Sequence, residues 1–205
     1  MLSIVIPTKN EQYFLPNLLY SIFSQNYTQF EVVVSDCNST DETLNIAESY
    51  EYQTVIGSNS TSEAMNKGAK LSCATYPYLL FLDADIVLPD NDFLDNMMEY
   101  VIQNNIKMGT CAIKQTKHSI EADIWSAFRY HIPTLTGAFI LIEKNIYFNT
   151  GGMPEGINFD AKYSIFLRKR GYKIRNMPFF VYHTRYMSEP YKHFRNLPVK
   201  DLFTI

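Results

Sequence analysis

The chain has 205 residues, 46% hydrophobic and 19% charged, which is typical of a globular protein with enough apolar material for a core. This length fits one domain, so we expect residues 1–205 to form a single unit. A net charge of −3 argues against a nucleic-acid partner. Three scattered cysteines, Cys37, Cys73 and Cys111, have neither metal-ligand nor disulfide spacing, which favours a reducing compartment. No stretch is typical of a signal peptide or a membrane-spanning helix, and we expect a cytoplasmic protein.

Strands and helices alternate along the first half of the chain. Short apolar runs predict four strands, at residues 2–6, 31–35, 53–56 and 78–82. Apolar residues at helical spacing predict helices between them, which begin near Asn10, at Ser39 and at Ser60. The last two helices begin with the capping-box spacing, in which an acid follows a serine by three residues. This alternation predicts an α/β fold with a mostly parallel sheet flanked by helices.

The second half of the chain is less regular. We expect, in chain order, a helix around residues 93–101, a strand at 107–113, a helix at 121–130, a strand at 136–142 and a turn at 150–155. A helix that opens at Asp160 and ends at Gly171 precedes a last strand within residues 173–181, which leads into His183.

Polar side chains follow three of the predicted parallel strands. Pro7 to Glu11 follow the first strand, Asp36 the second, and Asp83 and Asp85 the fourth. Since the carboxyl ends of parallel strands meet at one edge, these loops should line one crevice. Two carboxylates one residue apart can share a hard divalent cation such as Mg²⁺ or Mn²⁺. An Asp-x-Asp pattern alone is weak, and a solvated turn before Pro89 is the alternative interpretation.

Together these motifs resemble those of the family-2-type nucleotide-sugar glycosyltransferases with the GT-A fold. Residues 3–11 are similar to the family's opening strand and its Pro-x-x-Asn-Glu loop. Residues 32–41 resemble its Asp-Asp-Gly-Ser-Thr-Asp segment, and residues 80–85 resemble the stretch that ends in its Asp-x-Asp metal motif. Gly137-Ala138 and Gly151-Gly152 match the acceptor-side turns, and Asp160 stands where the family's Glu-Asp pair ends.

This resemblance implies metal-dependent transfer of a sugar, with inversion, from a UDP- or GDP-linked donor to a hydroxyl of a glycan, lipid or protein. It implies a nucleotide-binding half of about residues 1–113, an acceptor half of about 114–183 and a tail at 184–205. The implied nucleotide contacts are Pro7, Thr8, Asn10, Glu11, Asp36, Asn66 and Asp83. The implied ligands of Mn²⁺ or Mg²⁺ are Asp83, Asp85 and His183, and Asp160 is the implied catalytic base.

Several alternatives stay open at the level of the sequence. Without the resemblance, Asp160 is more simply a first-turn helix acid and His183 a structural histidine. Met65, Phe159 and Lys162 depart from the family's pattern, which keeps a non-catalytic nucleotide-binding module open. Asp83 to Val87 also resembles the nucleophile motif of haloacid-dehalogenase-type phosphatases, although that motif normally opens its domain. Interleaved basic and aromatic residues in the tail suggest peripheral membrane contact, against a tail packed on the domain.

Overall fold

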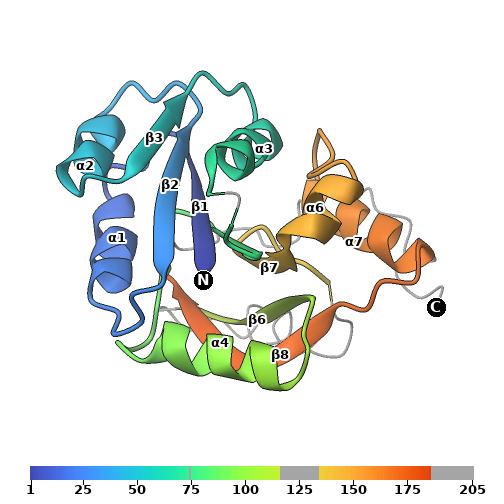
Figure 1. The fold of residues 1–205 in the computed structure, drawn as a ribbon. Coiled ribbons are helices and arrows are strands. Elements are labelled where there is room, and N and C mark those ends of the chain that lie inside the picture. The colour runs from blue at the N-terminus through green and yellow to red at the C-terminus, as the bar shows by residue number, and fades with distance from the viewer. Residues whose placement is uncertain (74, 116–133, 186–205) are drawn as a thin grey trace.

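The structure, a computed structural model, describes residues 1–73, 75–115 and 134–185 (Figure 1). Its first half consists of β1 (Leu2–Thr8), α1 (Leu15–Phe23), β2 (Phe30–Asp36), α2 (Thr43–Ser49), β3 (Gln53–Ile56), α3 (Thr61–Leu71) and β4 (Tyr78–Leu82). The elements that follow are β5 (Ile86–Val87), α4 (Phe93–Gln103), β6 (Met108–Gln115), β7 (Phe139–Glu143), α6 (Lys144–Asn149), α7 (Phe159–Lys169) and β8 (Arg175–His183).

Within these residues the strands form one eight-stranded sheet with the order β3-β2-β1-β4-β7-β6-β8-β5. The four strands from the first half pair in parallel. Across the junction with the second half, β4 pairs antiparallel with β7, and the remaining strands combine parallel and antiparallel pairings. The predicted α/β fold, with a parallel first half and a mixed second half, is confirmed.

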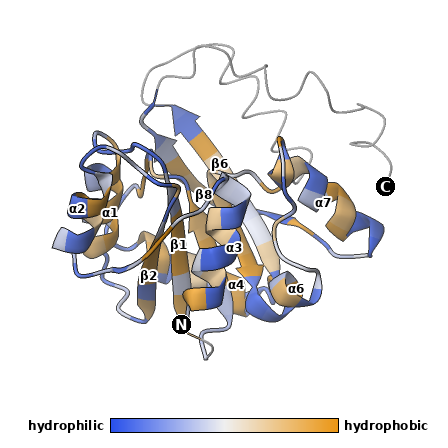
Figure 2. Cartoon of the chain, turned by 90° about the horizontal axis from the view of Figure 1, so that it is seen from above, coloured by the Kyte–Doolittle hydropathy of each residue, from blue (hydrophilic) through white to orange (hydrophobic). Residues whose placement is uncertain are grey.

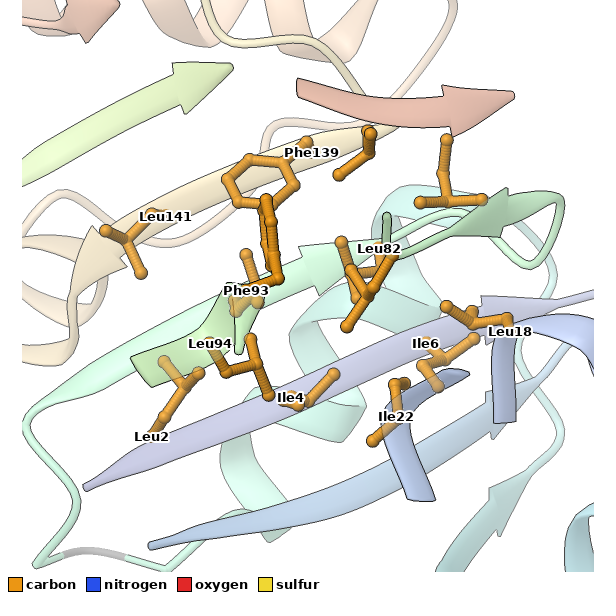
Figure 3. Packing of buried hydrophobic residues seen from close by; sticks show 14 of the residues in the cluster. Leu2, Ile4, Ile6, Leu18, Ile22, Leu82, Phe93, Leu94, Phe139 and Leu141 are labelled. Carbon is orange, nitrogen blue, oxygen red and sulfur yellow. The ribbon is translucent and has the colours of Figure 1, made fainter. Parts of the chain in front are cut away.

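The central strands are apolar on both faces because helices cover both. Ile4 and Ile6 of β1 pack with α1, α2 and α4, whereas Val5 between them packs with α3, α6 and α7. Figure 2 shows hydrophobic residues gathered at the strands and hydrophilic segments on the outer helices. Figure 3 shows the first of these clusters, in which Leu18 and Ile22 of α1 reach the strands. A sheet covered on both faces explains why β1 and β4 are continuous apolar runs without alternation.

Some predicted element boundaries were wrong. Asn10 does not cap a helix, because it adopts a left-handed conformation with φ of 55° and α1 begins only at Leu15. Ser39 does not open α2, whose N-cap position is Glu42. In contrast, Ser60 caps α3 as predicted, since its side chain accepts a hydrogen bond from the Glu63 N–H. The strand expected at 136–142 is β7 at Phe139–Glu143, preceded by a single bridge from Thr136.

The sequence patterns did not predict β5 or α6, and the predicted helix at 121–130 lies outside the described residues. Nor do the described helices include one long and apolar enough to cross a membrane.

Candidate active site

The carboxyl ends of β1, β2 and β4 lie at the same edge of the sheet. Thr8 at the end of β1 is in register with Asp36 at the end of β2, and Val5 is in register with Phe81 of β4. The Cys37 N–H continues the ladder by donating to the Thr8 carbonyl at 2.8 Å. The polar loops that follow these strands therefore face one region, as the alternating pattern predicts.

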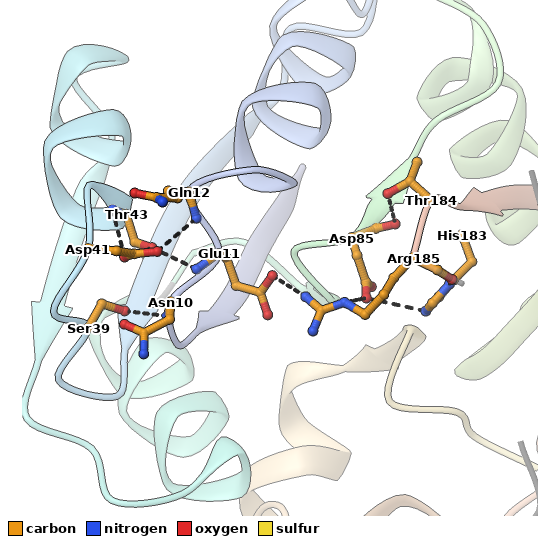
Figure 4. A network of polar contacts seen from close by, with 10 residues as sticks. All are labelled: Asn10, Glu11, Gln12, Ser39, Asp41, Thr43, Asp85, His183, Thr184 and Arg185. Atoms are coloured by element: carbon orange, nitrogen blue, oxygen red, sulfur yellow. Dashed lines mark hydrogen bonds and ion pairs between the residues drawn. The ribbon is translucent and has the colours of Figure 1, made fainter. Parts of the chain in front are cut away.

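Hydrogen bonds join the loops after β1 and β2 (Figure 4). The Asn10 N–H donates to Ser39 Oγ at 2.8 Å, and Asn10 Oδ1 accepts from the Thr40 N–H at 2.9 Å. The Glu11 N–H donates to Thr43 Oγ1 at 2.7 Å. Two of the predicted nucleotide-binding residues are thus fixed through their backbone N–H groups, Asn10 to the loop after β2 and Glu11 to the first residue of α2. This arrangement leaves the carboxylate of Glu11 pointing away from that loop, toward the end of β4.

Asp36 is fully buried and is held by the protein itself. Its Oδ1 accepts from Thr8 Oγ1 at 2.9 Å, and its Oδ2 accepts from the Ser39 N–H at 2.7 Å. Pro7 and Thr8 are buried beside it at the end of β1. In this structure the carboxylate ties two loops together, and the contact of Pro7, Thr8 and Asp36 with a nucleotide stays a prediction.

Asn66 on α3 is similarly occupied by internal contacts. Its Nδ2 donates to the Met153 carbonyl at 2.8 Å, while its Oδ1 accepts from Tyr147 Oη at 2.6 Å and from the Met153 N–H at 2.8 Å. A Cβ at Gly152, where φ is 77°, would lie 2.5 Å from Asn66 Oδ1. Asn66 therefore fixes the Gly151-Gly152 turn to α3, and its predicted nucleotide contact is likewise untested.

Four carboxylates gather where β4 ends, and we call Glu11, Asp83, Asp85 and Asp160 the carboxylate cluster. Burial, followed by the charges of Asp85, Asp160 and Glu11, raises the pKa of Asp83 to about 7, whereas the charge of Arg185 lowers it. Burial also raises the pKa of Glu11 above its ordinary value. A nearby cation favours the ionised form of carboxylates that lie this close to one another.

Asp85 and His183 meet because β5 pairs with β8. Ile86 is in register with His183, and the Thr184 N–H donates to the Asp85 carbonyl at 2.9 Å. His183 Nε2 lies 3.3 Å from Asp85 Oδ2, and both side chains are about one-tenth exposed. The structure thus brings together two of the predicted metal ligands that are 98 positions apart in the chain.

Asp160 lies in the first turn of α7, and backbone N–H groups hold its carboxylate. Oδ2 accepts from the Gly137 N–H at 3.0 Å, and Oδ1 accepts from the Ala161 N–H at 2.8 Å. A Cβ at Gly137 would lie 3.6 Å from Asp83 Oδ2, so the backbone of residue 137 passes close to both acids. Gly137 was recognised from the sequence as part of a turn, but not as the group that orients Asp160.

The site also contains a residue that the sequence analysis missed. The Arg185 guanidinium forms ion pairs with Glu11 and, at 2.9 Å from Nε to Oδ2, with Asp85. It also lies 4.5 Å from the centre of the Phe14 ring. The only sequence signal was a basic residue two positions after His183, which is too common a pattern to indicate a role.

The carboxylate cluster and His183 contain ligand atoms that suit a hard divalent cation. Asp85 Oδ1 is buried and, among the residues that the structure describes, makes no hydrogen bond. Carboxylate oxygens with one imidazole nitrogen are ligands for Mg²⁺ or Mn²⁺. In residues 1–73, 75–115 and 134–185, no three acidic, histidine or cysteine side chains are already grouped around one point as a finished metal site. The residues therefore fit a cation chemically, while its full set of ligands is not assembled.

The sequence model of the family described as "Glycosyl transferase family 2" matches residues 3–156. The chain belongs to this family. The matched residues contain Glu11, Asp83 and Asp85 but end before Asp160, His183 and Arg185, so the second half of the site rests on the structure. Family membership gives no support to the phosphatase interpretation of Asp83 to Val87.

Curated relatives of this glycosyl transferase family 2 chain match up to about half of it. A PGL/p-HBAD biosynthesis glycosyltransferase from Mycobacterium tuberculosis is 39% identical over 108 residues, which are 49% of this chain and 41% of that protein. The poly(ribitol-phosphate) β-N-acetylglucosaminyltransferase TarS from Staphylococcus aureus is 34% identical over 90 residues, 40% of this chain and 16% of TarS. The chain thus spans less than half the length of these relatives.

Solved structures share the fold over most of the chain. A fragment of S. aureus TarS in complex with UDP-GlcNAc has a TM-score of 0.72 and 20% identity, covering 92% of this chain and 59% of the fragment. The mannosyltransferase PcManGT from Pyrobaculum calidifontis, in complex with GDP-Man and Mn²⁺, has a TM-score of 0.72 and 19% identity, covering 88% of this chain and 56% of that chain. The GT-A fold expected from the sequence is confirmed.

Proposed function

We propose that the chain transfers a sugar from a UDP- or GDP-linked donor to an acceptor hydroxyl, using a divalent cation held by Asp83, Asp85 and His183. The observation that carries this proposal is the carboxylate cluster at the end of β4. Burial and the charges of the neighbouring acids raise the pKa of Asp83 to about 7, and Asp85 Oδ1 is a buried acceptor that makes no hydrogen bond among the described residues. A bound cation would neutralise the leaving diphosphate as a Lewis acid.

The donor nucleotide would lie over the loops after β1 and β2. Asn10 and Glu11 are fixed there by hydrogen bonds to Ser39 and Thr43. Asp36 joins the end of β1 to the loop after β2 through its bonds with Thr8 and Ser39. Family membership and the neighbours crystallised with UDP-GlcNAc and GDP-Man support a nucleoside-diphosphate sugar as the donor class. Asp83 is close enough to both Glu11, in the loop after β1, and Asp160 for their charges to raise its pKa. From this position it would contact both the cation and the ribose.

Asp160 would remove the proton from the acceptor hydroxyl. Its two backbone hydrogen bonds fix the carboxylate next to Asp83, on the side of the site formed by the second half of the chain. A fixed carboxylate close to the cation site is what an inverting transfer requires, because the base must face the sugar carbon from the side opposite the leaving group. An acceptor hydroxyl of a glycan, lipid or protein would approach from that side.

Peripheral contact of residues 184–205 with a membrane remains a further proposal, based on the basic and aromatic residues of the tail.

Release of UDP or GDP from a panel of sugar nucleotides, with Mn²⁺ and with simple sugar or lipid acceptors, tests the proposed function. We expect turnover of at least one donor in the parent chain and its loss in Asp85→Asn. Metal-dependent nucleotide binding without any release of UDP or GDP would instead favour the non-catalytic binding module. Release of phosphate from simple phosphoesters would revive the phosphatase interpretation.

A further inference from the structure

Arg185 connects the two parts of the carboxylate cluster that come from different strand ends. Its guanidinium forms ion pairs with Glu11, in the loop after β1, and with Asp85, directly after β4. The Glu11 and Asp85 side chains are only 15% and 11% exposed, whereas the Arg185 side chain is 43% exposed. The arginine therefore covers one buried and one partly buried acid from the solvent side, and its guanidinium lies over the ring of Phe14.

Arg185 contacts a carboxylate of the proposed cation site, that of Asp85. Its Nε lies 2.9 Å from Asp85 Oδ2, the oxygen that is also 3.3 Å from His183 Nε2. Its backbone carbonyl lies 2.8 Å from His183 Nδ1. Because a carbonyl oxygen can only accept, Nδ1 carries the hydrogen of this bond, and Nε2 is the nitrogen that faces Asp85. A hydrogen bond from one ring nitrogen to a carbonyl orients the other ring nitrogen toward a metal.

We propose that Arg185 is a built-in cation of the site, which occupies Asp85 Oδ2 before a divalent cation binds and must leave that oxygen when it does. Two cations cannot share one carboxylate oxygen without repulsion, so the two compete. One guanidinium does not balance the four acids of the cluster, and the site keeps its attraction for a divalent cation while Arg185 is paired. This inference rests on the proposed cation site.

Mn²⁺ titration of the full 205-residue chain, without nucleotide and followed by calorimetry and by the electron paramagnetic resonance signal of free Mn²⁺, tests the competition. Arg185→Ala should bind Mn²⁺ roughly threefold to tenfold more tightly than the parent, since a partly buried ion pair no longer opposes the cation. Arg185→Lys should lie between the two, because a point charge cannot pair with both acids as a guanidinium does.

Arg170→Ala is the matched control. Arg170 also stacks on an aromatic ring, that of Phe166 at 3.7 Å, but it lies at the end of α7 away from the cluster, so its replacement should leave Mn²⁺ affinity unchanged. Phe14→Leu removes the ring beneath the guanidinium without changing any charge and should tighten Mn²⁺ binding by a smaller factor than Arg185→Ala. Thermal unfolding of each variant verifies that it is folded.

Unchanged or weaker Mn²⁺ binding in Arg185→Ala would overturn the inference, because Arg185 would then be neutral toward the cation or help to hold it. Asp85→Asn distinguishes this failure from failure of the cation site itself. If the parent binds Mn²⁺ and Asp85→Asn does not, the site stands and the comparison of Arg185 variants decides the competition. If Asp85→Asn binds Mn²⁺ as well as the parent, the proposed cation site is wrong and the competition is wrong with it.

Discussion

The strands β2 and β4, which lie on either side of β1, both end in acids at the same edge of the sheet, but the surroundings of these acids differ. At the end of β2, Asp36 is fully buried, and both of its oxygens accept hydrogen bonds from Thr8 and Ser39. At the end of β4, Asp85 has one buried oxygen without a hydrogen bond among the described residues, and burial together with neighbouring acids raises the pKa of Asp83.

This difference indicates that the acid after β2 has a structural role and that the acids after β4 have a role in binding. A buried carboxylate whose oxygens are all used by the protein contributes stability and fixes loops. A buried carboxylate surrounded by other carboxylates is unfavourable until a cation arrives, which is typical of a binding site. The two strand ends should therefore respond oppositely to mutation, with stability lost at β2 and ligand binding or turnover lost around β4.

The largest effect is expected for Asp160→Asn, on the far side of the carboxylate cluster. The amide keeps the shape of the side chain but cannot take a proton, so sugar transfer should fall by roughly 10²- to 10⁴-fold while donor affinity is kept. Steady-state transfer rates and calorimetric donor binding measure the two effects separately. Near-normal transfer would reassign Asp160 to the role of a helix first-turn acid.

Replacing Asp85 with asparagine should lower metal-dependent nucleotide affinity by a factor of the order of 10² while the midpoint of thermal unfolding changes little. The variant loses the charge that attracts the cation. It also loses the ion pair with Arg185, which costs little stability because the arginine side chain is 43% exposed. Titration of the variant with UDP and GDP in the presence of Mn²⁺ makes this measurement. Parent-like affinity would show that the metal ligands are elsewhere.

Asp36→Ala should have the opposite outcome. It leaves the Thr8 hydroxyl and the Ser39 N–H without their acceptor in a buried position, so the free energy of unfolding should fall by about 2–3 kcal/mol. Urea unfolding followed by circular dichroism gives this value, with Asp85→Asn as the control from the other strand end. A stable Asp36→Ala variant that fails to bind nucleotide would give Asp36 a direct contact with the base instead.

The smallest predicted effect is the pH dependence of cation binding. Because the pKa of Asp83 is raised to about 7, the acid is mostly protonated at pH 6 and mostly ionised at pH 8. A cation binds the ionised form, so Mn²⁺ affinity should rise by about tenfold from pH 6 to pH 8. Asp83→Asn should flatten this dependence, and a parent chain without it would contradict the raised pKa.

The raised pKa of Asp83 also determines whether the stability of the metal-free chain rises or falls with pH. A raised pKa means that the folded chain holds the proton of Asp83 more tightly than the unfolded chain, whose pKa is near 3.8. Stability is therefore highest below about pH 4 as far as this group is concerned and falls as the pH rises toward 7. Added Mn²⁺ should restore the loss at pH 8, which thermal unfolding can follow.

Local patterns predicted the parts of the fold that depend on local interactions. The cap of α3 by Ser60 is decided within three residues, and the apolar runs of β1 and β4 are long enough to show a buried strand. The start of α1 could not be predicted, because Asn10 takes its left-handed conformation while bonded to Ser39 and Thr40 in another loop.

The site residues also divide into those that local sequence indicates and those that depend on contacts between distant segments. Asp83 and Asp85 were visible as an abrupt pair of acids after an apolar run, whereas His183 and Asp160 were assigned only through resemblance to a family. Arg185 was missed because its partner Glu11 is 174 positions away in the chain. The two come near each other only through the pairing of β5 with β8 and that of β1 with β4. A contact that depends on the sheet order cannot be inferred from spacing along the sequence.

The most direct test of the account is calorimetric titration of the parent chain with UDP and GDP, each with and without Mn²⁺. If the carboxylate cluster holds a cation that in turn holds a diphosphate, one nucleotide should bind tightly with Mn²⁺ and at least tenfold more weakly without it. Binding of neither nucleotide under any condition, or equal binding with and without metal, would contradict the role assigned to the end of β4.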